Sequence, residues 1–252
     1  MGADSGPPGQ RRPAYPAAGD LVTCLLAPVI YRLSHNALVA GCNDDGHGKG
    51  MIVTSDDDTL ALLERALDQT AAIIAAIPPS QSGLATPCPG WDVRALVRHL
   101  VGQDMRNFLA SARGETADWR APADELGDDW AAEFRDRAGR LLAVWRAADL
   151  GQPIAMPGGG EAPLRGRADQ QIAELATHGW DLVKATGQRA DLDPALAEHA
   201  LDWSHRVLRP EFRGPDKAFG LEVPVSPDAP AYDRLAGWFG RDPGWAPAGQ
   251  PS

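Results

Sequence analysis

Long apolar runs, clusters of basic residues and paired cysteines are all missing from this 252-residue sequence. Because a membrane-spanning helix needs about 20 consecutive apolar residues, no membrane partner is expected. The net charge of −10 and the lack of a Lys/Arg cluster argue against nucleic acid and against anionic membrane surfaces. The three cysteines form no C-x-x-C pair, and their odd number favours a reduced, cytoplasmic setting over a disulfide framework.

Several catalytic motifs are also missing. The sequence contains no G-x-S-x-G, no phosphate-binding P-loop and no H-E-x-x-H. Its glycine-rich stretch GGGEAPLRG does not lead from a strand into a helix with the spacing of a dinucleotide site, so we interpret it as a loop. No motif of this kind therefore identifies catalytic residues, which stay unassigned.

Composition divides the chain into three parts. Residues 1–53 are rich in Gly, Pro and Ala without a sustained helical or strand period, so they are either a disordered leader or precede a true start at Met51. Residues 54–190 carry helical periodicity and are expected to form a four-helix bundle. Residues 191–252 are expected to be a C-terminal helical extension and tail.

The helical pattern predicts an all-α fold. Ser55 and Asp58 have capping-box spacing at the start of the first helix, and Gly187 suits the C-cap of the fourth. Four amphipathic helices with one long connection favour a four-helix bundle. A fifth helix and a tail with a short strand and a short helix are expected to follow. The expected helices cover residues 55–77, 91–112, 128–148, 169–187 and 193–208.

The stretch ELATHGWDL carries the clearest candidate site. Glu174 and His178 are four residues apart, so a helix presents both side chains on one face. His99, at the edge of an apolar stripe on another helix, is the best third ligand. Two His and one carboxylate leave a coordination position open on Zn²⁺, as in catalytic sites, although the same set suits other divalent metals. The alternative is a half-exposed, salt-bridged pair with no metal.

Four residues around this site are interpreted one by one. Asp181 either accepts the second ring N–H of His178 and fixes its tautomer, or is a solvated charge. Trp91 and Trp180 are expected to be packing residues. Arg106, two turns from His99, is a candidate for binding an acidic substrate.

Three further side chains lie outside the predicted site. His199 and His205 are interpreted as surface residues, and Cys88 as a packing or surface residue.

Two segments resemble a known family. TPCPGWDVRALVRHLVGQ is similar to the signature helix of the mycothiol-dependent maleylpyruvate isomerase metal-binding domain, and ELATHGWDLVKATGQ to its second metal motif. The ending PDAPAYDRLAGWFGRDPGW resembles short actinobacterial members. The resemblance covers about Ser55 to Trp245 and implies a DinB-like four-helix bundle. It also implies a divalent metal, usually zinc, bound by His99, Glu174 and His178.

The resemblance implies a thiol chemistry. Mycothiol would be the thiol cofactor, and the partners would be this small-molecule thiol and a small electrophile. Full-length isomerases carry a further domain for which the segment after Val207 is too short, so thiol addition or transfer is as reasonable an expectation as isomerisation. A metal-dependent hydrolase using Asp181 or Asp104 as base, and a non-enzymatic metal-stabilised interaction module, are the alternatives. The sequence does not determine the oligomeric state.

Overall fold

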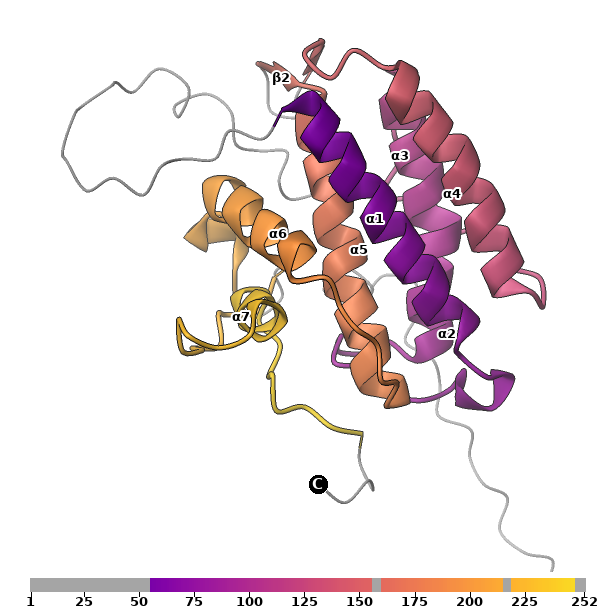
Figure 1. Cartoon of the computed structure of the whole chain (residues 1–252), viewed down its shortest axis with the longest axis vertical. Helices are drawn as coiled ribbons and strands as arrows, with labels where there is room; N and C mark the ends of the chain where they lie inside the picture. The colour runs from indigo at the N-terminus through magenta and orange to yellow at the C-terminus, as the bar shows by residue number, and fades with distance from the viewer. Residues whose placement is uncertain (1–54, 156–159, 215–218, 248–252) are drawn as a thin grey trace, which may run out of the picture.

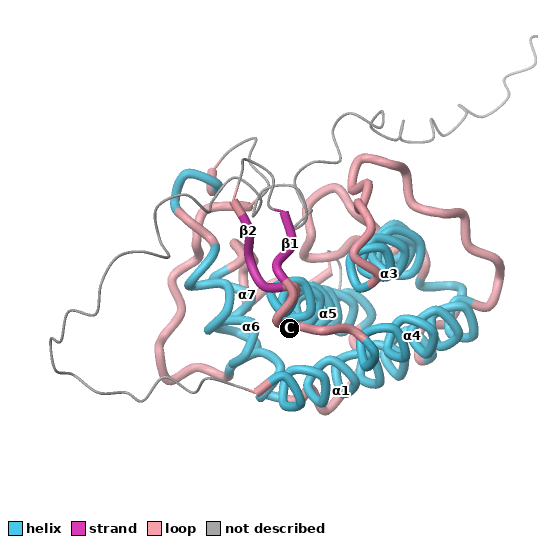
Figure 2. The backbone as a smooth tube through the Cα atoms, turned by 90° about the horizontal axis from the view of Figure 1, so that it is seen from above, coloured by secondary structure: helices cyan, strands magenta, loops and turns pink. Residues whose placement is uncertain are grey.

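The computed structural model describes residues 55–155, 160–214 and 219–247, and these form a helical structure with one small hairpin (Figures 1 and 2). The predicted all-α fold is confirmed, while the predicted leader lies outside the described residues. Two short 3₁₀ turns, Pro79–Gln81 and Pro210–Phe212, interrupt the loops. The main elements are α1 Asp56–Ala75, α2 Val93–Arg98, the π-helix η4 His99–Asp104, α3 Met105–Ala112, α4 Trp130–Ala147, β1 Pro153–Ala155, β2 Glu161–Pro163, α5 Arg165–Thr186, α6 Pro194–Val207 and α7 Ala231–Trp238.

Four rods make the bundle: α1, the continuous segment α2–η4–α3, α4 and α5. The view from above shows them side by side, with α6 and α7 outside α5 (Figure 2). The central rod is α5, which packs against α1, α3 and α6. Large apolar side chains fill the space between the rods, and the largest fully buried ones include Phe108, Phe134, Leu141, Trp145, Ile172 and Leu182.

Local sequence signals set several helix ends. Ser55 Oγ accepts the Asp58 N–H at 3.1 Å while the Ser55 N–H donates to Asp58 Oδ2 at 3.0 Å, which is the predicted capping box. Asp92 caps α2 by accepting the Ala95 N–H at 2.7 Å. Gly187, with φ of +68°, ends α5 in the left-handed conformation expected of a C-cap glycine.

The predicted secondary structure was wrong in four places. The expected single helix 91–112 contains the π-helix η4 in its middle, and the fourth helix begins at Arg165 rather than Asp169. The predicted glycine-rich loop contains the antiparallel β1–β2 hairpin, in which Pro153 pairs with Pro163. The predicted tail helix is α7, but the described part of the tail has only an isolated bridge between Arg213 and Phe219 in place of a strand. These features depend on tertiary packing, which periodicity does not report.

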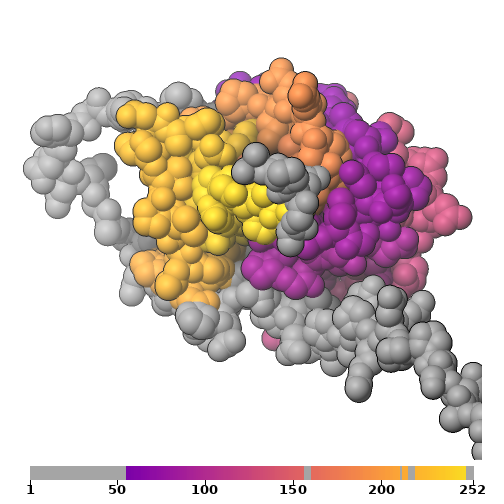
Figure 3. Space-filling view, turned by 90° about the horizontal axis from the view of Figure 1, so that it is seen from below, coloured from indigo at the N-terminus to yellow at the C-terminus, as the bar shows by residue number. Residues whose placement is uncertain are grey.

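The C-terminal extension lies against the bundle. Helix α6 packs on α5, and α7 packs on both α6 and α5. From below, the yellow surface of this segment adjoins the orange and purple surfaces of the bundle (Figure 3). Among the described helices, none combines the length and apolar character needed to span a bilayer.

Candidate metal centre

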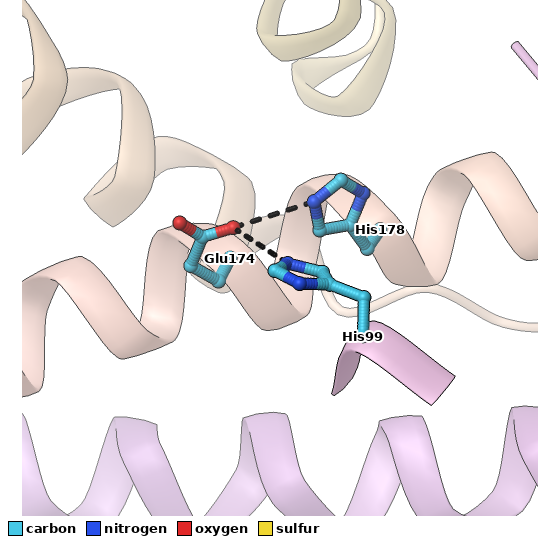
Figure 4. Close-up of side chains that lie close together, drawn as sticks. All are labelled: His99, Glu174 and His178. Atoms are coloured by element: carbon cyan, nitrogen blue, oxygen red, sulfur yellow. Dashed lines mark ion pairs between the residues drawn. The ribbon is translucent and has the colours of Figure 1, made fainter. Parts of the chain in front are cut away.

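The three predicted ligands meet in the bundle interior. His99 is the first residue of η4, and Glu174 and His178 lie one turn apart on α5 (Figure 4). Glu174 Oε2 is 3.3 Å from His178 Nε2 and 3.9 Å from His99 Nε2. The three candidate donor atoms all lie within 4.8 Å of one another. The exposed alternative is wrong, because none of these side chains is more than 2% exposed.

The π-helix sets the position of His99. All six residues of η4 are buried, and among them are the polar residues His99, Gln103 and Asp104. A π-turn inserts one extra residue into the helical register, and such turns occur frequently at functional sites. The sequence analysis missed it, although a glycine at 102 within a helical pattern was one available signal.

Hydrogen bonds orient both imidazole rings. His99 Nδ1 lies 2.9 Å from Gln103 Oε1, and His178 Nδ1 lies 3.0 Å from Asp181 Oδ2. Because both partners are acceptor oxygens, each Nδ1 donates, and the neutral ring keeps its lone pair on Nε2. Both Nε2 atoms are the ones directed at Glu174. Asp181 is therefore the acceptor of the His178 ring N–H rather than a solvated charge, because its side chain is fully buried.

The donor set fits a divalent cation. His99 Nε2, His178 Nε2 and both carboxylate oxygens of Glu174 have no hydrogen-bond partner although they are buried. Buried polar groups without partners are costly, and a metal ion would satisfy all of them at once. Two imidazole nitrogens and one carboxylate oxygen form a ligand set used by catalytic zinc sites.

Ionisation in the metal-free site follows from the close pairing. Burial raises the pKa of Glu174, but the neighbouring charges of His178 and His99 outweigh it and hold this pKa below its ordinary value. Burial lowers the pKa of His178, yet Asp181 and Glu174 raise it above 6.5 overall. Burial likewise lowers the pKa of His99, but the negative charge of Asp104, together with Glu174, outweighs burial and raises this pKa overall. The three side chains therefore form an ion-paired cluster.

Two other side chains border the centre. Asp104 Oδ2 is 3.3 Å from His99 Nε2, and burial raises the pKa of this carboxyl well above its ordinary value. Trp91 packs edge-on to His99, with ring centroids 4.9 Å apart, and parallel to His178 at 6.3 Å. Trp91 is thus a packing residue, as predicted, but the rings it packs on are the candidate ligands. Trp180 is also buried, with Lys184 over its ring.

Several other predictions about individual residues need correction. Arg106 does not face the centre, because Asp124 pairs with it at 2.5 Å and holds it on the 121–124 segment. His199 is not a surface residue: its side chain is 8% exposed and Nε2 lies 2.9 Å from Asp169. His205 is exposed, as predicted. Cys88 is fully buried, which agrees with a packing role.

A cavity of about 660 Å³ is bordered by the 114–120 segment, and none of the three candidate ligands lines it. Its wall includes Ser111, Trp119 and Arg167, together with the β1 strand. Arg167 is about two turns, or roughly 10 Å, from Glu174 along α5. The Trp119 carbonyl accepts the Gln103 amide at 2.9 Å, and Gln103 also holds His99. The cavity wall and the candidate ligand therefore share one hydrogen-bonded side chain.

Fold and site together define an all-α bundle with an internal two-histidine, one-carboxylate cluster. Residues 63–183 match the family model of the mycothiol maleylpyruvate isomerase N-terminal domain. The chain belongs to this family.

Similar proteins include two from Mycobacterium tuberculosis: Rv0738 of strain H37Rv and MT0763 of strain CDC 1551, both described as uncharacterized. Each is 33% identical over 198 residues, covering 73% of this chain and 98% of the relative. Two crystal structures of mycothiol-dependent maleylpyruvate isomerase are also similar, each aligned over 58% of this chain and 68% of that one. One of them, a histidine-to-alanine mutant, has a TM-score of 0.47 at 15% identity, and the other has 0.43 at 13%.

Proposed function

We propose that this chain binds a divalent metal ion, zinc by preference, through His99, Glu174 and His178. We further propose that the centre serves mycothiol-dependent addition to, transfer onto or isomerisation of a small electrophile. The observation that carries the metal proposal is the convergence of two Nε2 atoms and a carboxylate, buried and without hydrogen-bond partners. Family membership supports the thiol, since the family is named for a mycothiol-dependent enzyme.

The residues around the centre have separate tasks in this proposal. Gln103 and Asp181 hold the two rings by their Nδ1 atoms, so that both Nε2 atoms stay available as ligands. Trp91 covers the rings and keeps water from that side. A metal held here would stabilise the thiolate form of a bound thiol. The cavity bordered by Trp119 is large enough for a small molecule, and Gln103 connects its wall to His99, which supports entry from the Trp119 side.

Metal-dependent hydrolysis is the second candidate, and the position of Asp104 favours it. Asp181 is already engaged by His178 and by Arg241, so it is a poor general base. Asp104 borders the centre, and neither of its oxygens has a hydrogen-bond partner. Chelator-sensitive cleavage of esters or amides, with no effect on thiol reactivity, would favour this candidate over thiol transfer.

Metal content provides the first test. Untagged protein should contain about one zinc per chain by elemental analysis, and His99→Ala and His178→Ala should lose it. His205→Ala is the matched control, because this histidine is exposed and packs on Trp238 outside the centre. A wild-type protein that stays metal-free after reconstitution would refute the metal proposal.

Thiol reactivity provides the second test. The alkylation rate of mycothiol should be measured against pH with zinc-loaded protein, with chelated protein and with glutathione as the comparison thiol. A zinc-dependent shift of the mycothiol profile to lower pH is expected. If zinc binds but the profile does not move, the thiol proposal fails. The chain would then be a metal-stabilised module or a hydrolase.

A further inference from the structure

The C-terminal segment returns to the bundle at Arg241. Its guanidinium grips Asp181 with two hydrogen bonds: Nε to Oδ1 at 3.3 Å and Nη2 to Oδ2 at 3.1 Å. A third hydrogen bond, from Nη1 to the Phe239 carbonyl at 3.0 Å, fixes the guanidinium to its own backbone. The Asp181 side chain is fully buried and that of Arg241 is 10% exposed, so water competes little for this pair.

The turn at the end of α7 positions Arg241. The Arg241 N–H bonds back to the Ala236 carbonyl at 2.8 Å and the Gly240 N–H to the Gly237 carbonyl at 3.0 Å, a Schellman-type reversal. Gly240 has φ of +79°, and a Cβ there would lie 2.9 Å from the Leu221 carbonyl oxygen. The backbone preceding Arg241 is therefore defined by the turn and by a close chain contact, rather than by the arginine alone.

The same aspartate orients a candidate ligand. Asp181 Oδ2 accepts from Arg241 and lies 3.0 Å from His178 Nδ1. A buried carboxylate held by a bidentate arginine has a fixed plane. Asp181 held in this position accepts the Nδ1–H of His178, which leaves Nε2 as the ligand atom.

We infer that Arg241 is a positioning residue of the metal centre, acting on His178 through Asp181. The C-terminal segment 219–247 is thus a supporting part of this centre, although it lies beyond the residues 63–183 that match the family model. The inference rests on the proposed metal site. It predicts that ligand geometry and metal affinity depend on a residue that does not contact the metal.

The test compares two arginines of the same segment. Arg241→Met removes the two hydrogen bonds to Asp181. Arg234→Met, the matched control, removes a pair that Arg234 makes with Glu198 on α6, so it perturbs docking of the segment without touching Asp181. Zinc affinity should be measured by competition with a chromophoric chelator, and the visible spectrum recorded with Co²⁺. Arg241→Met should lose about 10- to 100-fold in affinity and alter the Co²⁺ spectrum, while Arg234→Met should leave both unchanged.

Two further variants separate positioning from a structural role. In an Asp181→Asn background, Arg241→Met should cost little additional affinity, because the partner that transmits its effect has been altered. Arg241→Lys keeps the charge but not the bidentate geometry, so an intermediate affinity is expected. If Arg241→Met fails to fold, Arg241→Lys carries the test by its affinity and Co²⁺ spectrum.

The outcomes are distinguishable from failure of the proposed function. If folded Arg241→Met, or Arg241→Lys in its place, binds zinc as wild type does with an unchanged Co²⁺ spectrum, the inference is overturned and the metal site stands. Equal losses in Arg241→Met and Arg234→Met would also overturn it, because docking alone would explain them. A wild-type protein that binds no metal would overturn the proposed function together with this inference.

Discussion

Gly102 in the π-helix should not tolerate even one additional carbon atom. A Cβ at this position would lie 2.7 Å from the Asp124 carbonyl oxygen and 2.8 Å from its backbone nitrogen. Such separations are too short, and the atoms in the way are backbone rather than flexible side chain. Gly139, in the middle of the exposed face of α4, is the matched control because nothing lies within 4 Å of a Cβ there.

The two Gly→Ala substitutions should have opposite signs. Replacing a mid-helix glycine by alanine gains about 0.5–1 kcal/mol in helix stability, which Gly139→Ala should show in full. Overpacking typically costs about 1–3 kcal/mol, so Gly102→Ala should lose roughly 1–2 kcal/mol after the helical gain is subtracted. The two variants should then differ by about 2–3 kcal/mol, or roughly 5–10 °C in Tm for a domain of this size.

The substitution at Gly102 should also weaken zinc binding at the proposed metal centre. The segment 121–124, which the Cβ would displace, holds Gln103 through the Ala121 carbonyl at 3.2 Å, and Gln103 holds His99. Urea unfolding followed by circular dichroism gives the stability, and chelator competition gives the zinc affinity. A Gly102→Ala protein as stable as wild type would refute the close approach of η4 to 121–124. A destabilised variant with unchanged zinc affinity would refute only the connection to His99.

Three further outcomes are expected. Chelated protein should lose stability as pH rises above 6.5, because the folded state raises the pKa values of His99 and His178. The stability that their protonation contributes is complete below pH 6.5 and is lost as pH rises through the folded pKa values. Urea unfolding midpoints between about pH 6 and pH 8 measure this loss. Zinc should stabilise the protein more as pH rises over the same range, because zinc binding displaces protons from the ligands. The increase in Tm caused by zinc measures this stabilisation. An increase in Tm that becomes smaller with rising pH would contradict the ligand assignment. Ser55→Ala should cost about 1 kcal/mol by removing the α1 cap, measured by urea unfolding, and no loss would contradict the capping box.

Features set by local geometry were predictable from the sequence. The capping box at Ser55 and the C-cap at Gly187 involve residues close together in the chain, and both are present. Glu174 and His178 share a helix face because i and i+4 positions always do. His99 was the candidate third ligand from its place at the edge of an apolar stripe, and the structure brings it to the other two.

Features set by long-range packing were not predictable. The π-turn adds one residue to a helix whose apolar pattern still reads as continuous. The contact of Asp104 with His99 therefore does not follow from α-helical spacing, although Asp104 was named as a candidate base. Arg241 lies 60 positions beyond Asp181 in the chain and reaches it only because the backbone reverses at Gly240. Neither contact leaves a signature in spacing, since each depends on where two separately folded elements meet.

Helix α5 is buried on nearly all sides, and its polar residues are buried with the apolar ones. Its apolar residues Ile172, Leu175 and Leu182 are buried. The remaining faces are buried too, because α1, α3 and α6 surround the helix. Gln171 and Thr177 look like solvent-facing residues in the sequence, yet they lie inside, and each has a polar atom without a hydrogen-bond partner. Polar residues enclosed on the central helix conflict with core packing, and such conflicts are expected where function outweighs stability. The functional part of this molecule is therefore expected along α5, independently of any family resemblance.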